Sequence, residues 1–95
     1  MKMISYWKNT VDIYDDDGFV LIIGYYDHKN QYNGGDKELG VHWGTYPQSR
    51  GILSPCVIPA STRSAILSGL LHKAVTAGDL KTIYSLTKAI EFFNT

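Results

Sequence analysis

The stretch from His42 to Arg50 gathers side chains that are able to recognise a ligand. It reads HWGTYPQSR, so that a tryptophan, a tyrosine and an arginine lie close to one proline. An aromatic ring beside a guanidinium suits stacking on nucleic-acid bases and pairing with a phosphate or a carboxylate. We therefore expect Tyr46 and Arg50 to bind a ligand from a turn over residues 46–49, in which Pro47 fixes one φ angle.

Four further residues extend this candidate site. Arg63 falls in the first turn of the helix that follows, where backbone N–H groups also favour an anion, and it flanks the same short strand as the turn. The other three come from the polar stretch DHKNQYNGGDK, whose length is typical of functional or disordered loops. They are Lys29, Tyr32 and Lys37. Phosphate contacts supply most of the binding of nucleic acid, so these basic residues must cluster if that is the ligand.

The sequence contains no pattern for catalysis or metal binding, and we expect no catalytic residue, no metal and no cofactor. The histidines at positions 28, 42 and 72 do not share the spacing of metal ligands. A general base at His42 needs a nearby nucleophile or carboxylate, and Glu38 lies four residues away along the same strand. The run DDDG at 15–18 lacks the alternating ligands and closing glutamate of an EF-hand, so it predicts a hairpin turn instead.

An antiparallel sheet in the first half of the chain must position these residues. Residues 11–26 predict a hairpin around the Asp-Gly turn. The preceding MISYW is either a separate strand or the beginning of one long curved strand. GILSPCVIP predicts the last strand, and Pro55 places it at a sheet edge or at a bulge because proline cannot donate a hydrogen bond.

The alternating run ELGVHW predicts the strand between them, with three residues facing the core and three facing outward. The inward residues are Leu39, Val41 and Trp43, and the outward ones are Glu38, Gly40 and His42. On this interpretation HWGTYPQSR is, at its simplest, a hairpin loop anchored by Trp43 in the core. His42 is then exposed to solvent, or lies in an interface if a partner covers that face.

The strand predicted at 19–26 is apolar on both faces. Phe19, Leu21, Ile23 and Tyr25 form one face, and Val20, Ile22 and Tyr26 form the other. Apolar residues on both faces indicate that both are covered. Helices cover one face, and the other requires more of the chain or a second subunit, which favours a homodimer.

The second half of the chain predicts two helices over about 60–93. Pro59 ends the last strand, and Ser61 or Thr62 is expected to cap the first helix. Its apolar stripe is Ile66, Leu67, Leu70, Leu71, Ala74 and Val75. Gly78 ends this helix and Asp79 caps the next, whose apolar residues are Leu80, Ile83, Tyr84, Leu86, Ile90 and Phe93. Residues 1–95 are therefore expected to form one α+β domain, in which an αα-hairpin packs on a sheet of about four strands over 3–58.

Composition narrows the classes of function. Nine basic and nine acidic residues cancel, so no overall field draws the chain to nucleic acid or to an anionic membrane. Residues 1–50 carry a net charge of −2 and residues 51–95 carry +2. Cys56, the only cysteine, is expected to be a small buried hydrophobe. No stretch is as apolar as a signal peptide or a membrane span, so we expect a cytoplasmic protein without membrane contact.

The order of four strands and a helix, with GVHW, RGILSPCVIP and ILSGLL in succession, resembles Whirly-type and PC4-like single-strand-binding modules. The resemblance covers about residues 11–75 and implies paired sheets that bind unpaired DNA on their strands. The sequence departs from that layout in its zero net charge, its lack of a lysine-rich stretch and its additional C-terminal helix.

We therefore expect a small non-enzymatic binding protein whose ligand is single-stranded nucleic acid. The alternative is a protein-interaction module, such as a bacterial or phage immunity, antitoxin or inhibitor protein, which uses its aromatic and acidic first half against a basic partner.

Overall fold

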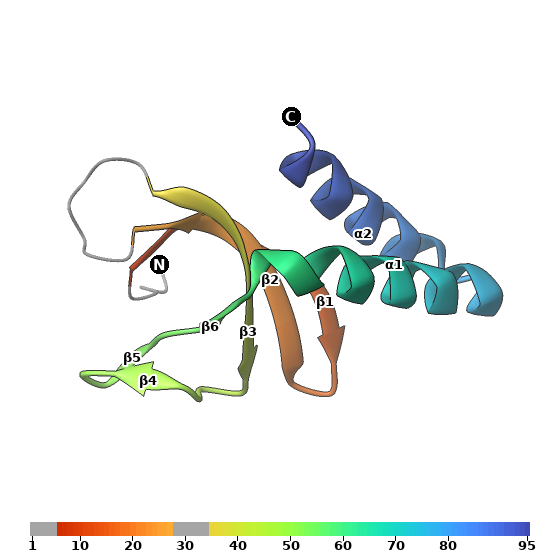
Figure 1. The fold of residues 1–95 in the computed structure, drawn as a ribbon. Coiled ribbons are helices and arrows are strands. Elements are labelled where there is room, and N and C mark those ends of the chain that lie inside the picture. The colour runs from red at the N-terminus through yellow and green to blue at the C-terminus, as the bar shows by residue number, and fades with distance from the viewer. Residues whose placement is uncertain (1–5, 28–34) are drawn as a thin grey trace.

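The computed structural model describes residues 6–27 and 35–95, and it has the α+β architecture that the sequence predicts (Figure 1). Four strands form an antiparallel sheet in the order β1-β2-β3-β6, and two short strands, β4 and β5, form a separate hairpin. The elements are β1 (Trp7–Asp16), β2 (Phe19–Tyr26), β3 (Asp36–Trp43), β4 (Gln48–Ser49), β5 (Ile52–Leu53), β6 (Cys56–Ile58), α1 (Ala60–Ala77) and α2 (Leu80–Phe93). The candidate residues Lys29 and Tyr32 lie outside the described residues.

The first hairpin is confirmed, and its turn is Asp17–Gly18. Both residues have positive φ, 52° and 94°, which is the geometry that an Asp-Gly turn between two strands requires. The Gly18 N–H donates to Asp15 Oδ1 at 3.0 Å and stabilises the turn. From Trp7 onward β1 is one long strand with two irregularities, one of them between Lys8 and Val11.

The αα-hairpin covers one face of the sheet, and the core lies between the two layers. Its buried residues are Ile13, Leu21, Ile23, Leu39, Leu67, Ala74, Leu86 and Ala89. Gly78 ends α1 in the left-handed conformation, and Asp79 caps α2 by accepting from the Thr82 N–H at 3.2 Å, both as predicted. In the described residues no helix is long and apolar enough to cross a membrane.

Two predictions about the helices are wrong. The N-cap of α1 is Pro59, while Ser61 and Thr62 lie inside its first turn, where the Thr62 hydroxyl donates back to the Pro59 carbonyl at 3.0 Å. Pro59 already has the extended conformation of an N-cap residue, so the helix begins directly after it. Three residues placed on the apolar stripes are exposed, because the sides of the helices that face the core are narrower than predicted and bury only Leu67, Ala74, Leu86 and Ala89. They are Val75, Leu80 and Tyr84.

The chain itself covers the second face of β2. Trp7 is only 6 % exposed and packs with Val20, Ile22 and two partly buried neighbours, Tyr26 and Val57. The Trp7 indole N–H donates to the Pro55 carbonyl at 3.2 Å, which ties β1 to the segment leading into β6. Within a single chain Ile22 is therefore completely buried, and the apolar second face of β2 does not by itself require a second subunit.

This arrangement reverses two predicted burials in β3. His42 is buried at 6 % exposure, because it lies beside Val20 on the face that Trp7 covers. Trp43, expected in the core, is 46 % exposed. Leu39 and Val41 do face the helices, so the alternation of β3 was predicted correctly. The prediction was wrong about how much of each face of β3 is covered. Cys56, expected to be buried, is exposed on the edge strand β6.

Gly40 provides the close approach that lets Trp7 cover the sheet. A Cβ atom at Gly40 would lie 2.6 Å from Trp7 Cζ2, well inside van der Waals contact. We predict that Gly40→Ala lowers the free energy of unfolding by about 1–3 kcal/mol, the usual cost of overpacking. The measurement is urea unfolding followed by the fluorescence of the buried indole.

Gly69→Ala is the matched control for this substitution. Gly69 lies in α1 with open space around its Cα, so alanine is expected to stabilise the protein by about 1 kcal/mol through helix propensity. Equal effects of the two substitutions would contradict the Trp7–Gly40 contact.

Candidate aromatic docking surface

Three exposed aromatic side chains form a row across one end of the sheet, which we call the aromatic row. Phe19 on β2 lies directly opposite Trp43 on β3, and Trp43 forms an antiparallel bridge with Tyr46. Directly opposite residues of antiparallel strands project on the same side, so Phe19 and Trp43 share one side of the sheet, and Tyr46 is the bridge partner of Trp43. The ring centroids of Trp43 and Tyr46 are 5.3 Å apart, and the three side chains are 45 %, 46 % and 60 % exposed.

The aromatic row belongs to the face that carries the helices, but the helices end before they reach it. Phe19 is on the same side of β2 as Leu21 and Ile23, which are buried under α1 and α2. Figure 1 shows the ends of β2 and β3 near the β1–β2 turn extending beyond α1. The row is therefore a continuation of the core side of the sheet that is left open to solvent.

Two glycine-containing turns shape this end of the molecule, which differs from the single turn predicted at 46–49. The first turn runs from Trp43 to Tyr46, with Gly44 at φ 59° and backbone hydrogen bonds of 2.9 and 3.1 Å between its ends. The Tyr46–Pro47 peptide bond is cis. The second turn is Arg50–Gly51, both at positive φ, between β4 and β5. Tyr46 and Arg50 thus project from two different turns.

Carboxylates, rather than cations, border the Phe19 end of the aromatic row. Asp16 on β1 lies directly opposite Phe19, and it has no hydrogen-bond or ion-pair partner within the part of the chain that the structure describes. Asp15 precedes it on β1 and Asp17 follows it in the turn, and the Gly44 N–H donates to the Gly18 carbonyl at 2.9 Å, which joins this turn to the end of β3. A hollow of about 230 Å³ between β1 and the two helices is lined in part by Tyr14, Asp15, Asp16 and Lys73.

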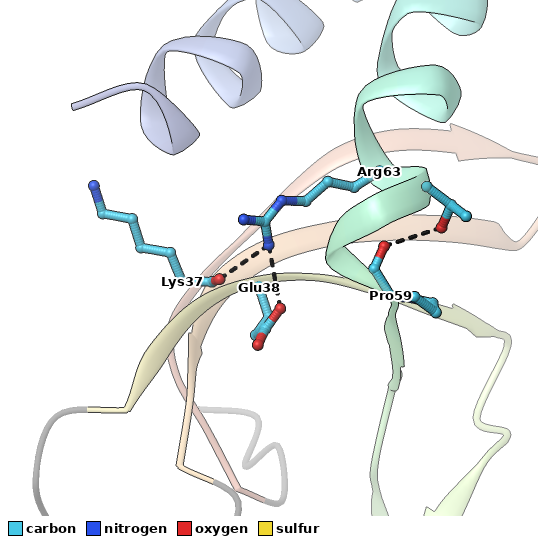
Figure 2. Close-up of polar contacts among 5 residues, drawn as sticks. Lys37, Glu38, Pro59 and Arg63 are labelled. Carbon is cyan, nitrogen blue, oxygen red and sulfur yellow. Dashed lines mark hydrogen bonds and ion pairs between the residues drawn. The ribbon is translucent and has the colours of Figure 1, made fainter.

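Arg63, a predicted ligand-binding residue, instead joins the sheet to the helices (Figure 2). Its Nη1 donates to the Lys37 carbonyl and to Glu38 Oε1, both at 3.2 Å, and its guanidinium lies 4.1 Å from the centroid of the Phe93 ring. The structure therefore does not bring Arg63 together with Arg50, which lies at the β4–β5 turn.

Lys37, another predicted ligand-binding residue, binds the end of α2. Its ammonium donates to the Phe92 carbonyl at 2.9 Å and to the carbonyl and hydroxyl oxygens of Thr95 at 3.0 and 3.1 Å. It also lies 5.1 Å from the centroid of the Phe92 ring. Of the four predicted site residues that the structure describes, only Tyr46 and Arg50 remain directed to solvent.

His42 has one hydrogen bond in the described structure, from its ring to the turn that follows β3. Its Nδ1 lies 3.0 Å from the Gly44 carbonyl, which can only accept, so Nδ1 carries the proton. No group of histidine, cysteine, aspartate or glutamate side chains among residues 6–27 and 35–95 is placed to hold a metal ion.

Sequence reasoning identified Tyr46 but missed Phe19 and Trp43 as surface residues. The signal that would have found them is their place at the ends of strands. Phe19 directly follows the Asp-Gly turn and Trp43 directly precedes Gly44, so both lie where a covering layer of two helices is least able to reach.

No family model, no curated protein and no solved structure matches this chain.

Substituting each of the two tryptophans distinguishes the buried one, Trp7, from the exposed one, Trp43, by the effect on stability. We predict that Trp43→Ala lowers the free energy of unfolding by about 1 kcal/mol or less, as at other surface positions. Trp7→Ala is expected to cost about 4 kcal/mol, because it empties the covered second face and removes the hydrogen bond to Pro55. Chemical unfolding of both variants measures this difference, and a cost for Trp43→Ala as large as that for Trp7→Ala would place Trp43 in the core.

Glu38 gives the link between β3 and α1 a pH dependence. Burial raises the pKa of Glu38, and Asp36 adds to this, although Arg63 acts in the opposite direction. The folded chain then binds this proton more tightly than the unfolded chain does, so the stabilisation is present at low pH and is lost as pH rises through the raised pKa.

We predict that the free energy of unfolding of the native chain, relative to that of Glu38→Gln, falls over the range in which the pH rises from the ordinary glutamate pKa of 4.5 through the raised pKa of Glu38. Thermal or urea unfolding across this range measures the difference, because the other titrating groups are common to both proteins. A difference that increases with pH would show that the attraction of Arg63 outweighs burial.

Proposed function

We propose that this chain is a non-enzymatic protein-interaction module that docks a basic partner on the aromatic row. The observation that carries the proposal is the exposed row Phe19–Trp43–Tyr46 with the carboxylate of Asp16 directly beside it. Exposed clusters of aromatic side chains are typical of protein interfaces, in which Tyr and Trp supply much of the binding free energy. The neighbouring carboxylates add attraction for a cationic partner and accelerate its association.

Single-stranded nucleic acid is less favoured as the ligand, because the charges lie in the wrong places. Stacking on Trp43 and Tyr46 is compatible with bases, but phosphate neutralisation requires free cations near the rings. Arg63 and Lys37 are bound to Glu38 and to the end of α2, and Asp16 repels phosphate at the Phe19 end of the row. Arg50 is the predicted cation that remains exposed in the described residues.

An immunity, antitoxin or inhibitor protein is the type of module that this surface suits. Such a protein blocks a basic site on its target, and an acidic, aromatic surface on a rigid sheet is complementary to that site. The module requires no catalytic residue and no cofactor for this role. A homodimer is not needed to cover β2, so we propose that the partner binds a single chain.

Neutralising Asp16 tests the electrostatic part of the proposal. Affinity capture from the native host, with the chain as bait, is expected to yield one stoichiometric protein partner. Asp16→Asn keeps the shape of the side chain and is expected to slow association with this partner about two- to threefold at low salt, with little effect in about 0.5 M salt. Surface plasmon resonance at several salt concentrations measures the rate.

Asp36→Asn is the matched control. It also removes one carboxylate charge, but Asp36 begins β3, at the end of the strand away from Trp43 and the aromatic row. The proposal is contradicted if the two variants associate equally fast. It is also contradicted if Trp43→Ala leaves capture unchanged, or if short oligonucleotides bind the chain with a strong salt dependence while no protein partner is captured.

A further inference from the structure

The dimensions of the aromatic row match one turn of a polyproline II helix. Neighbouring strands lie about 4.8 Å apart, which is the backbone step from Phe19 to Trp43, and the ring centroids of Trp43 and Tyr46 are 5.3 Å apart, so we take the length of the row as about 10 Å. A polyproline II helix rises about 3.1 Å per residue with three residues per turn, so residues i and i+3 project on one side about 9 Å apart. Two prolines at this spacing would rest on Phe19 and Tyr46, with Trp43 between them.

The row also offers hydrogen-bond donors to such a ligand. A polyproline II helix has no internal hydrogen bonds, so its backbone carbonyls are free to accept from a receptor. Among the described residues neither the Trp43 indole N–H nor the Tyr46 hydroxyl has a hydrogen-bond partner, and both side chains are exposed. Aromatic side chains that combine an apolar face with a free donor are the usual lining of surfaces that bind proline-rich segments.

Charge selects which proline-rich segment fits. The row ends at Asp16, directly opposite Phe19, and Asp17 follows Asp16 in the turn. The hollow between β1 and the two helices is lined by three aspartates, Asp15, Asp16 and Asp79, and by one cation, Lys73. A ligand that extends past Phe19 therefore meets carboxylates, and an arginine or lysine there would pair with them.

We propose that the aromatic row binds a proline-rich segment of the partner, with the pattern Pro-x-x-Pro and basic residues at one end. This inference rests on the proposed function and specifies the chemistry of the partner. The bound segment crosses the strands, with its prolines on Phe19 and Tyr46 and its basic end at Asp16. Because polyproline II ligands can be recognised in either chain direction, the basic residues can precede or follow the prolines.

Fluorescence of Trp43 provides the test. The probes are the synthetic peptides RRPLPPLP and PLPPLPRR, titrated into the intact chain. Binding of at least one is expected to shift the emission of the exposed Trp43, whereas Trp7, which is buried, reports that the fold is intact. The peptide EEPLPPLP is expected to bind about tenfold more weakly, and RRGLSGLS, which lacks the polyproline II conformation, is expected not to bind.

Substitutions assign the binding to the row. Phe19→Ala and Tyr46→Ala are each expected to weaken binding of the better peptide about tenfold or more, as at the centre of other interfaces. Tyr84→Ala is the control, because Tyr84 is equally exposed but lies on α2. Circular dichroism of each variant establishes that it is folded.

Three outcomes would overturn the inference: neither arginine peptide binds, RRGLSGLS binds as tightly as RRPLPPLP, or Tyr84→Ala weakens binding as much as the row variants do. An eight-nucleotide oligothymidylate that binds when both arginine peptides do not would assign the row to nucleic acid. If the peptides fail but a captured protein partner still depends on Trp43, only the proline-rich ligand is wrong and the docking surface stands.

Discussion

The packing of Trp7 over Gly40 is the constraint on which the rest of the structure depends. β2 is apolar on both faces, so the sheet is stable only if both are covered. The αα-hairpin covers one face, and Trp7 covers the other, because Gly40 has no Cβ to keep the indole away from the sheet. The hydrogen bond from the Trp7 indole to the Pro55 carbonyl then connects β1, at one edge of the sheet, to the segment that leads into β6 at the other edge. The small chain thereby builds a core on each side of one strand.

The same arrangement determines which residues remain available for a partner. The covering helices are held to the sheet by Arg63 and Lys37, whose charges are used for bonds to Glu38 and to the end of α2. The helices do not cover the end of the sheet near the β1–β2 turn, so its core face remains exposed there at Phe19, Trp43 and Tyr46. Arg63 and Lys37 are thus directed into the fold, while the carboxylate of Asp16 is left beside the exposed aromatic row. The bonds of Arg63 and Lys37 that hold the helices on the sheet therefore keep these two cations away from the aromatic row.

The sequence predicts the helices, strands and turns of this fold better than it predicts which of their residues are buried. The Asp17–Gly18 turn, the end of α1 at Gly78 and the cap at Asp79 depend on local backbone conformation, so local residue types suffice to predict them. Burial depends on contacts between distant segments. Trp43 was misplaced because the alternation of β3 does not tell how far α1 reaches.

The most direct measurement is the spectrum of the two indole N–H groups in the ¹⁵N-labelled chain. Trp7 and Trp43 give one signal each, and only the Trp7 indole is hydrogen-bonded within the described fold. On addition of a proline-rich basic ligand or the native partner, the account predicts that the Trp43 signal shifts and broadens while the Trp7 signal stays in place. A bound partner that leaves the Trp43 signal unchanged would contradict the assignment of the aromatic row as the docking surface.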